Sequence, residues 1–322
     1  MRRRDFIKTT AIAVPALSVF SADLSAITRR TAPGKIEKRS LGRTGEMLSM
    51  IGFGGIIVMN TTPEESSQLV KLAIDSGINY FDVAPTYGDA EVKLGPALEP
   101  YRNGVFLACK TTERSREGSR KELEQSLKHL RTDHLDLYQF HAVTTLKDVE
   151  TIHGPGGAME TYLEAKKEGK IRFIGFSAHS VEAAMAMMDR FDFDTILFPV
   201  NFATWNAGNF GPQVLERAKQ KKMGILALKA MAKGPWPKDA EKSKYPKCWY
   251  EPLSTPGDIR MGLRFTLSHP VTAALTSGQQ ELFKIALSVS DSLTPLNTDE
   301  MKRIKEKGLI QTPLFKFPSE KV

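Results

Sequence analysis

The sequence is poor in cysteine: its 322 residues contain only Cys109 and Cys248. Two cysteines cannot form a disulfide framework, and their separation matches no metal-ligand spacing, so we expect two small, partly buried side chains. The sequence also lacks a basic stripe with interleaved aromatic residues, which a nucleic-acid-binding protein would carry. Its net charge of +8 is scattered among interleaved acidic and basic residues. This pattern predicts a solvated surface that favours anionic ligands and no nucleic-acid partner.

Long apolar runs are absent as well, since no stretch reaches the ~20 apolar residues that a stable membrane span needs. The most apolar N-terminal stretch follows Arg3, Arg4, Phe6 and Lys8, which have the order R-R-x-F-x-K. A basic start, a short apolar region and small residues near Ala26 are typical of an export signal, and the paired arginines indicate the twin-arginine type. A basic disordered tail or an uncleaved anchor helix is the alternative interpretation.

This N-terminal pattern divides the chain into a predicted signal peptide over 1–26, with its cleavage site open, and a linker over 27–35. The twin-arginine export machinery is then a partner, and we expect a periplasmic or otherwise exported protein without a stable membrane span after processing. This route carries folded proteins, so an enzyme that acquires a soluble cofactor before export is a suitable client.

Strand and helix patterns alternate from Lys35 onward. Short apolar runs that predict strands begin near Ile51, Ile78, Val105, Leu135, Ile171, Thr195, Gly224 and Val271, with amphipathic stretches between them. Apolar residues in continuous runs are expected where both faces of a parallel sheet are buried. The segment after the first strand, G-F-G-G-I-I-V-M, does not match G-x-G-x-x-G, which argues against an open doubly wound sheet. We therefore predict an α/β fold, a closed (β/α)₈ TIM barrel over 36–322.

Two segments flank this alternating pattern or interrupt it. E-K-R-S-L and M-L-S-M-I surround G-R-T-G-E, which predicts an N-terminal β-hairpin. The segment 234–257 is rich in Pro, Lys and Trp and fits neither a helix nor a strand. Because it follows the seventh strand, we expect it to lie over the C-terminal mouth of the barrel, where a long loop is often functional.

Four ionisable residues stand at or just after the ends of successive predicted strands. Asp82 ends the second strand, Tyr87 lies in the loop after it, Lys110 ends the third, and His141 ends the fourth. Each has an ordinary structural explanation by itself: a turn cap, a loop anchor, a surface lysine or a buried histidine. In a (β/α)₈ barrel, however, the chemistry sits at the carboxyl ends of the strands, so together these residues predict an active site.

The segments D-V-A-P-T-Y-G, L-A-C-K, Q-F-H and I-G-F-S occur in this order, and the chain from Ile36 onward resembles the aldo-keto reductase family. The resemblance implies that the N-terminal hairpin closes the barrel bottom. It also implies that Asp82, Tyr87, Lys110 and His141 form a catalytic tetrad. The implied activity is reduction of an aldehyde or ketone, with hydride from NADPH and a proton from Tyr87.

The proposed chemistry is consistent with the residue types. A free tyrosine has a pKa near ~10, and a neighbouring Lys110 ammonium is expected to lower it by stabilising the phenolate. Asp82 would hold Lys110 in place and keep it charged. His141 would donate a hydrogen bond that orients the substrate oxygen.

The resemblance also implies where the dinucleotide binds. Ser177 and Asn201 would hydrogen-bond the carboxamide, although Ala178 stands where the family usually has Asn, a contact that His179 could replace. A tyrosine from the seventh strand commonly stacks on the nicotinamide; this chain offers Leu228, Lys229 and Met231 there, so an aliphatic side chain could pack against it instead. Lys229 could reach a phosphate or be a solvated loop residue.

The segment after the eighth strand departs most from the family pattern. Gly278 and the helix start after it suit a phosphate. Lys284 is the one nearby cation for an adenosine 2′-phosphate, and Glu281 opposes it. The resemblance therefore favours NADP as the cofactor, with NAD open.

Substrate identity is not encoded in these motifs. Trp205, Trp236, Trp249 and Tyr250 are candidates either to line an apolar pocket or to pack the long loop onto the barrel. A sugar, a steroid and a small aldehyde all stay open as the small-molecule carbonyl substrate. Because NADPH is not freely supplied outside the cytoplasm, an exported enzyme is expected to reoxidise its cofactor in place by coupling two substrates.

Two other functions compete with this interpretation. A barrel of this family could keep its cofactor as a redox sensor or regulatory subunit, and single rather than steady turnover would distinguish it. Metal-assisted hydrolysis or isomerisation would need converging His and carboxylate ligands, of which the strand ends supply only His141 and Asp82.

Overall fold

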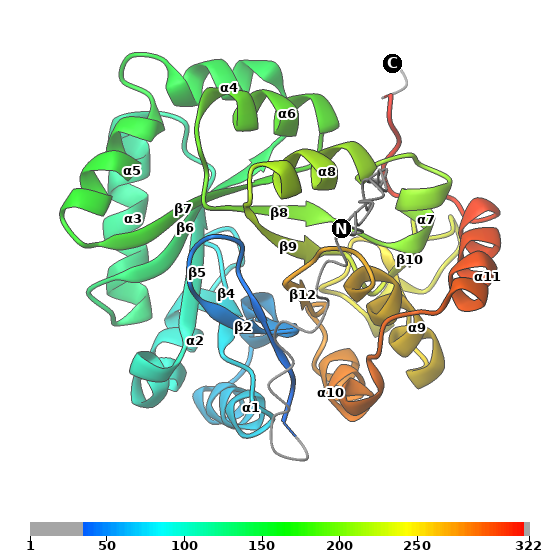
Figure 1. Cartoon of the computed structure of the whole chain (residues 1–322). Coiled ribbons are helices and arrows are strands. Elements are labelled where there is room, and N and C mark those ends of the chain that lie inside the picture. The colour runs from blue at the N-terminus through cyan, green and yellow to red at the C-terminus, as the bar shows by residue number, and fades with distance from the viewer. Residues whose placement is uncertain (1–34, 319–322) are drawn as a thin grey trace, which may run out of the picture. The chain divides into compact units, whose positions relative to one another are not determined.

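A closed barrel of eight parallel strands forms the centre of the chain, with the strand order β12-β3-β4-β5-β6-β7-β8-β9 (Figure 1). The structure is a computed structural model that describes residues 35–318. The barrel strands are β3 (Ile51–Gly54), β4 (Tyr80–Asp82), β5 (Phe106–Thr111), β6 (Leu135–Val143), β7 (Ile171–Ala178), β8 (Thr195–Pro199), β9 (Gly224–Leu228) and β12 (Ala273–Leu275). Each begins within two residues of a predicted strand, and the (β/α)₈ prediction is confirmed.

Helices surround the barrel (Figure 1). They are α1 (Pro63–Asp75), α2 (Ala90–Leu98), α3 (Arg116–Leu130), α4 (Leu146–His153), α5 (Ala158–Lys167), α6 (Val181–Arg190), α7 (Phe202–Asn206), α8 (Pro212–Gln220), α9 (Pro256–Leu267), α10 (Gln280–Ser288) and α11 (Thr298–Leu309). The start of α1 is set by its sequence, because Thr62 and Glu65 form a reciprocal capping box before Pro63. No helix within residues 35–318 is long and apolar enough to cross a membrane.

The N-terminal hairpin closes one end of the barrel, as the family resemblance implies. Strands β1 (Lys38–Ser40) and β2 (Met47–Ser49) pair antiparallel. Leu41 and Leu48 are fully buried and pack in one cluster with the inward-facing barrel side chains Tyr80, Leu137 and Leu226. The hairpin is therefore an apolar plug inside the barrel, at the end opposite to the carboxyl ends of the strands.

The segment 234–257 contains more regular structure than its sequence indicates. Strands β10 (Ala232–Gly234) and β11 (Glu251–Pro252) pair antiparallel, and a short 3₁₀ turn covers Lys242–Lys244. The expectation that this segment fits neither a helix nor a strand is therefore wrong at Gly234 in β10, in β11, and at its last two residues, where α9 begins at Pro256. Strands of two or three residues are too short to produce an alternating pattern in the sequence.

The predicted signal peptide over 1–26 and all of the linker over 27–35 except its last residue lie outside the described residues, so both stay predictions. Within residues 35–318, no group of three or more His, Cys, Asp or Glu side chains could hold a metal ion.

Candidate active site

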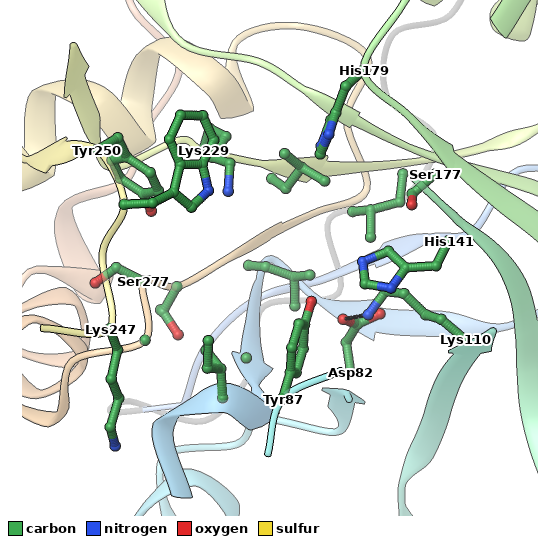
Figure 2. A pocket seen from close by; sticks show the side chains of 18 residues that line it. Asp82, Tyr87, Lys110, His141, Ser177, His179, Lys229, Lys247, Tyr250 and Ser277 are labelled. Atoms are coloured by element: carbon green, nitrogen blue, oxygen red, sulfur yellow. Dashed lines mark hydrogen bonds and ion pairs between the residues drawn. The ribbon is translucent and has the colours of Figure 1, made fainter. Parts of the chain in front are cut away.

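The four tetrad candidates line one pocket at the carboxyl ends of the barrel strands (Figure 2). Asp82 is the last residue of β4, Lys110 lies near the end of β5 and His141 near the end of β6. A tight turn after β4, closed by a hydrogen bond from Tyr87 N to Ala84 O (3.0 Å), brings the Tyr87 side chain over the same pocket. The predicted convergence of these residues on one pocket is confirmed.

A buried ion pair occupies the floor of the pocket. The Lys110 ammonium pairs with Asp82 and also donates to the carbonyl of Val83 at 3.1 Å, and both charged side chains are at most 2% exposed. The second Asp82 oxygen, Oδ2, accepts from Gln139 Nε2 at 3.0 Å and from the Tyr80 hydroxyl at 3.3 Å. The carboxylate is therefore satisfied on both oxygens, as a buried charge requires.

Gln139 and Tyr80 are site residues that the motif-based analysis missed. A signal for them was present, because Gln139 precedes His141 by two residues and Tyr80 precedes Asp82 by two. Residues two apart on a strand face the same side, which here is the barrel interior.

Tyr87 lies beside the ion pair and His141 (Figure 2). The Lys110 Nζ atom is 5.2 Å from the centroid of the Tyr87 ring, and the Tyr87 and His141 rings meet edge to face with centroids 5.9 Å apart. Burial raises the pKa of the Tyr87 hydroxyl, the Lys110 ammonium opposes this, and the net direction is upward. Lys110 thus lowers the pKa of Tyr87 as expected, but burial outweighs it, so the pKa does not fall below its ordinary value. Tyr87 stays protonated at neutral pH, which is the form that can donate a proton.

His141 is neutral in this environment. Burial, followed by the positive charge of Lys110 and the proximity of His179, lowers the pKa of His141 to about 3. Its Nδ1 atom lies 3.5 Å from the Thr86 hydroxyl oxygen. A neutral imidazole keeps one N–H that can donate a hydrogen bond to a substrate oxygen. It is also too weak an acid to compete with Tyr87 as the proton donor.

Lys229 lies across the pocket from the tetrad (Figure 2). Its ammonium is 4.9 Å from the ring centroid of Trp249 and 4.7 Å from that of Tyr250, a cation–π arrangement with both rings. Its backbone has φ 69°, a conformation that non-glycine residues rarely adopt. Burial lowers the pKa of Lys229 to about 8, and none of the carboxylates in residues 35–318 contributes to that shift. Lys229 is therefore a half-buried pocket cation rather than a solvated loop residue.

The other predicted cofactor residues divide into two groups. Ser177, Leu228 and Gly278 line the pocket. At Gly278, an added Cβ would lie 2.8 Å from the Ile56 side chain, so only glycine fits without a shift. His179, the predicted substitute for a family amide, also lines the pocket beside Ser177.

Asn201 and Lys284 do not line this pocket. The Asn201 Oδ1 atom caps α7 by accepting from Thr204 N at 2.9 Å, while its buried Nδ2 has no partner among the described residues. Lys284 is exposed on α10. The side-chain oxygen of Asn201 is thus committed to the fold, and its amide nitrogen is the atom left for a ligand.

The aromatic candidates for the pocket also divide. Trp249 and Tyr250 line it, whereas Trp205 packs on His269 with ring centroids 4.0 Å apart. Trp236 donates from Nε1 to the carbonyl of Cys248 at 2.8 Å, which anchors the loop after β9. Trp236 therefore packs within the long loop, whereas Trp205 fits neither interpretation, because it packs on His269 just after α9.

Phe315 in the C-terminal segment was not predicted to be near the site. Its ring stacks on His179 with centroids 5.3 Å apart and lies 6.1 Å from the Trp249 ring. No motif pointed to this contact, because it joins segments more than a hundred residues apart. The C-terminal segment therefore supports one wall of the pocket.

A family model described as the aldo/keto reductase family matches residues 50–248. The chain belongs to this family. It is 32% identical over 218 residues to the aldo-keto reductase YhdN of Bacillus subtilis, covering 62% of this chain and 63% of that protein. It is 27% identical over 216 residues to L-galactose dehydrogenase of Arabidopsis thaliana, covering 62% and 67%. The chain matches 157 residues of an uncharacterized oxidoreductase, YqkF, of Bacillus subtilis, at 31% identity, covering 44% of this chain and 49% of that protein. It thus spans less than two thirds of the length of YhdN and about half that of YqkF.

Solved structures of aldo-keto reductases share the fold. The holo form of AKR11C1 from Bacillus halodurans aligns with a TM-score of 0.68 at 22% identity, covering 88% of this chain and 99% of that one. An aldo/keto reductase from Klebsiella pneumoniae in complex with NADP and acetate aligns with a TM-score of 0.66 at 20% identity, covering 88% and 98%. At these identities, the likeness to the solved structures supports the (β/α)₈ barrel fold and not a specific activity.

Proposed function

We propose that the protein is a nicotinamide-dependent oxidoreductase that reduces an aldehyde or ketone to an alcohol. The observation that carries this proposal is the buried Asp82–Lys110 pair beside a protonated Tyr87 and a neutral His141 in one pocket. NADPH would supply the hydride. Tyr87 donates the proton to the developing alkoxide, Lys110 stabilises the resulting phenolate, and His141 orients the substrate oxygen.

NADP is the proposed cofactor, and several features of the pocket suit a dinucleotide. Lys229 is a cation without a carboxylate partner among the described residues, Asn201 Nδ2 is an unused buried donor, and Gly278 permits close approach before α10. Ser177 and Asn201 would hold the carboxamide and Leu228 would pack against the nicotinamide. The Klebsiella relative, whose structure is described as an NADP complex, adds support.

Replacing Tyr87 with phenylalanine tests the proton-donor role. We expect Tyr87→Phe to lower kcat for a test aldehyde by roughly 10²–10⁴-fold while the cofactor dissociation constant stays close to that of the wild type. Steady-state kinetics with NADPH, together with fluorescence titration of the cofactor, measure both quantities. Near-normal turnover in the variant would contradict the proposal, and a wild-type protein that reacts once and stops would favour the redox-sensor alternative.

Two lysines give a matched test of the cofactor contacts. If Lys229 binds the pyrophosphate, Lys229→Met weakens NADP and NAD equally, because both dinucleotides carry that group. If Lys284 binds the 2′-phosphate, Lys284→Met weakens NADP alone. Titration of both cofactors with both variants separates these roles, and unchanged affinity in Lys229→Met would remove Lys229 from the cofactor site.

We also propose that residues 1–26 direct export through the twin-arginine machinery to the periplasm or an equivalent compartment. The R-R-x-F-x-K pattern supports this. Substituting Arg3 and Arg4 together by lysine should retain the protein in the cytoplasmic fraction. Unchanged export after that double substitution would argue against the twin-arginine route.

A further inference from the structure

The end of β6, directly after His141, departs from regular strand geometry. The register between β6 and β7 shifts between Phe140 and Val143. Within that bulge Ala142 has φ 52°, a left-handed conformation that is unfavourable for any residue with a Cβ atom. Bulges of this kind re-aim a side chain at the end of a strand. Here the neighbouring side chain is His141. The left-handed conformation of Ala142 therefore needs stabilising contacts from its surroundings.

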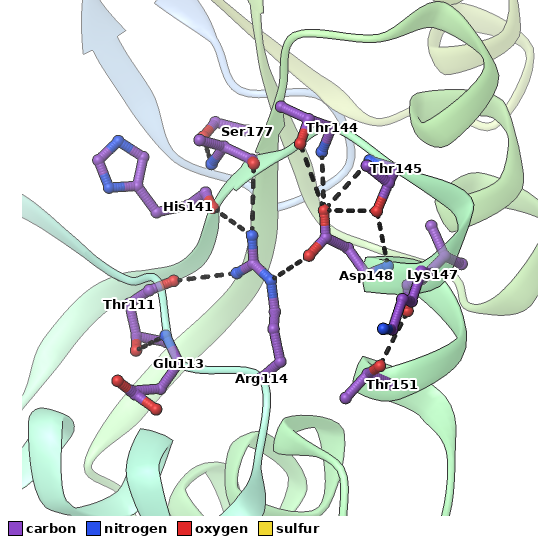
Figure 3. Close-up of polar contacts among 12 residues, drawn as sticks. Thr111, Glu113, Arg114, His141, Thr144, Thr145, Lys147, Asp148, Thr151 and Ser177 are labelled. Carbon is purple, nitrogen blue, oxygen red and sulfur yellow. Dashed lines mark hydrogen bonds and ion pairs between the residues drawn. The ribbon is translucent and has the colours of Figure 1, made fainter.

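Arg114 contacts this bulge from the loop after β5 (Figure 3). One terminal nitrogen, Nη2, donates to the carbonyl of His141 at 2.7 Å and to that of Ala142 at 3.3 Å. The other, Nη1, donates to the carbonyl of Thr111 at 3.4 Å. The guanidinium thus joins the end of β5, one residue after Lys110, to the backbone that carries His141.

Arg114 is itself held in place on its far side. Its Nε atom pairs with Asp148 Oδ1 at 3.2 Å, and the Arg114 side chain is 16% exposed. The Oδ2 atom of Asp148 accepts from the backbone nitrogens of Thr144 and Thr145 at 3.2 and 3.1 Å in the capping box of α4. The guanidinium is therefore a fixed fork rather than a mobile surface group.

The bulge is also attached to β7. The Ala142 N–H donates to Ser177 Oγ at 2.8 Å, and the His179 N–H donates to the Val143 carbonyl at 3.2 Å. The Ala142 N–H and the Val143 carbonyl are thus both satisfied by residues at the end of β7 or directly after it. On the acceptor side, Arg114 Nη2 is a side-chain donor to the carbonyls of both His141 and Ala142.

We propose that Arg114 is a positioning residue for His141: by clamping the His141 and Ala142 carbonyls it stabilises the left-handed bulge that aims the imidazole at the substrate oxygen. This inference rests on the proposed carbonyl reduction and deepens it. Arg114 does not touch the pocket contents itself, since it is not among the residues that line the pocket. It acts through backbone geometry, and the side chain that meets substrate is His141.

The test compares Arg114→Gln with Arg116→Gln. Arg116 lies two residues away, is half exposed, and pairs at the surface with Glu160 and Glu164, so it controls for loss of a cation from the same segment. A displacement of the catalytic group by about 1 Å costs on the order of 10²-fold in rate. We expect Arg114→Gln to lower kcat for the test aldehyde by about 10–100-fold, while its KM for NADPH changes by less than about threefold. In Arg116→Gln, we expect both kcat and KM to stay close to the wild-type values.

Rescue by glycine distinguishes positioning from a general structural role. Glycine adopts positive φ without a steric penalty, so the bulge no longer depends on the guanidinium. Adding Ala142→Gly to Arg114→Gln should therefore recover at least about fivefold of the lost kcat. A general loss of stability would lower the melting temperature and would not be reversed by glycine at this one position.

Several outcomes would overturn the inference. A folded Arg114→Gln variant that keeps kcat within about twofold of the wild type would do so, as would a loss that Ala142→Gly leaves unchanged. If Arg114→Gln does not fold, the same rescue is measured with Arg114→Lys, which keeps the charge near Asp148 but not the planar fork. A wild-type protein without reductase turnover would instead contradict the proposed function, so the two failures are separable.

Discussion

At the residue scale, the chemistry of the site depends on how its buried charges are satisfied. Asp82 has three side-chain donors, from Lys110, Gln139 and Tyr80, and Lys110 has a second acceptor in the Val83 carbonyl. Burial lowers the pKa of Lys110, but the charge and hydrogen bond of Asp82, together with Tyr87, outweigh burial and the pKa is raised. Lys110 therefore stays charged beside Tyr87, where the proposed proton transfer would leave a phenolate.

Removing one member of this pair should cost stability as well as activity. We expect Lys110→Met to destabilise the fold by roughly 3–5 kcal/mol, because it leaves the Asp82 carboxylate buried without its counter-ion. Gln139→Met should cost only about 1–2 kcal/mol, because it removes a single hydrogen bond. Urea unfolding of the two variants measures the difference. Equal stability losses would mean that the charge of Lys110 is not what balances Asp82.

Lys229 should make the free energy of unfolding depend on pH in the alkaline range. Its pKa is about 8 in the folded protein, below the usual value of 10.5, so the unfolded chain binds the proton more tightly. Below about pH 8 the full cost of burying the charge lowers the stability of the wild type. The free energy of unfolding of the wild type therefore increases as pH rises from about 8 to about 10.5.

Lys229→Met removes that cost. We expect the variant to melt at a higher temperature than the wild type at pH 7, with the difference shrinking towards pH 10. Melting curves of the cofactor-free protein across this range give the comparison, with Lys284→Met as an exposed control. A difference that is constant with pH would show that titration of Lys229 does not contribute.

At the scale of elements, the two ends of the barrel have separate tasks. The hairpin of β1 and β2 supplies the apolar plug at one end, and the loops after β4, β7, β9 and β12 build the pocket at the other. This separation of stability from chemistry is expected for a (β/α)₈ barrel.

The plug therefore offers a test that leaves the pocket intact. Leu48 is fully buried in the hairpin, so Leu48→Ala should leave a cavity and cost about 2–5 kcal/mol in the free energy of unfolding. At a temperature well below melting, kcat should stay within about twofold of the wild type because no pocket residue changes. A large loss of kcat in the folded variant would mean that the two ends of the barrel are coupled.

At the scale of the whole molecule, the pocket is assembled from segments spread over most of the chain, from Gly54 to Gly278. Its lining includes several cations, while Asp82, the one carboxylate among the described residues that line it, is neutralised by Lys110. An anionic dinucleotide bridging these segments should stabilise the entire barrel, by about 2.7 kcal/mol at a concentration 100 times its dissociation constant.

The proposed export of the folded chain leads to a further prediction about the cofactor. Protein purified from the exported fraction and then denatured should release a nicotinamide dinucleotide that mass spectrometry identifies, because a soluble cofactor must be acquired before export. The same preparation from the Arg3/Arg4 double lysine variant, recovered from the cytoplasm, is the control for loading. Protein that is empty in both fractions and binds neither NADP nor NAD would contradict the proposed function.

The sequence by itself determined the barrel and the tetrad. Short apolar strands, a capping box before α1, and ionisable residues at strand ends all act over a few neighbouring positions, so their pattern is readable in the chain. Family membership rests on the same local segments, and the match over residues 50–248 confirms the resemblance.

Only the tertiary structure decided how these residues behave. Desolvation depends on atoms from distant segments, and this is why burial outweighs Lys110 at Tyr87. Tertiary packing also brings Lys229 against the rings of Trp249 and Tyr250. Asn201 caps a helix with the oxygen that a motif would assign to a ligand. Arg114 acts on backbone carbonyls, which every residue has, so no pattern of side chains in the sequence could reveal what it holds.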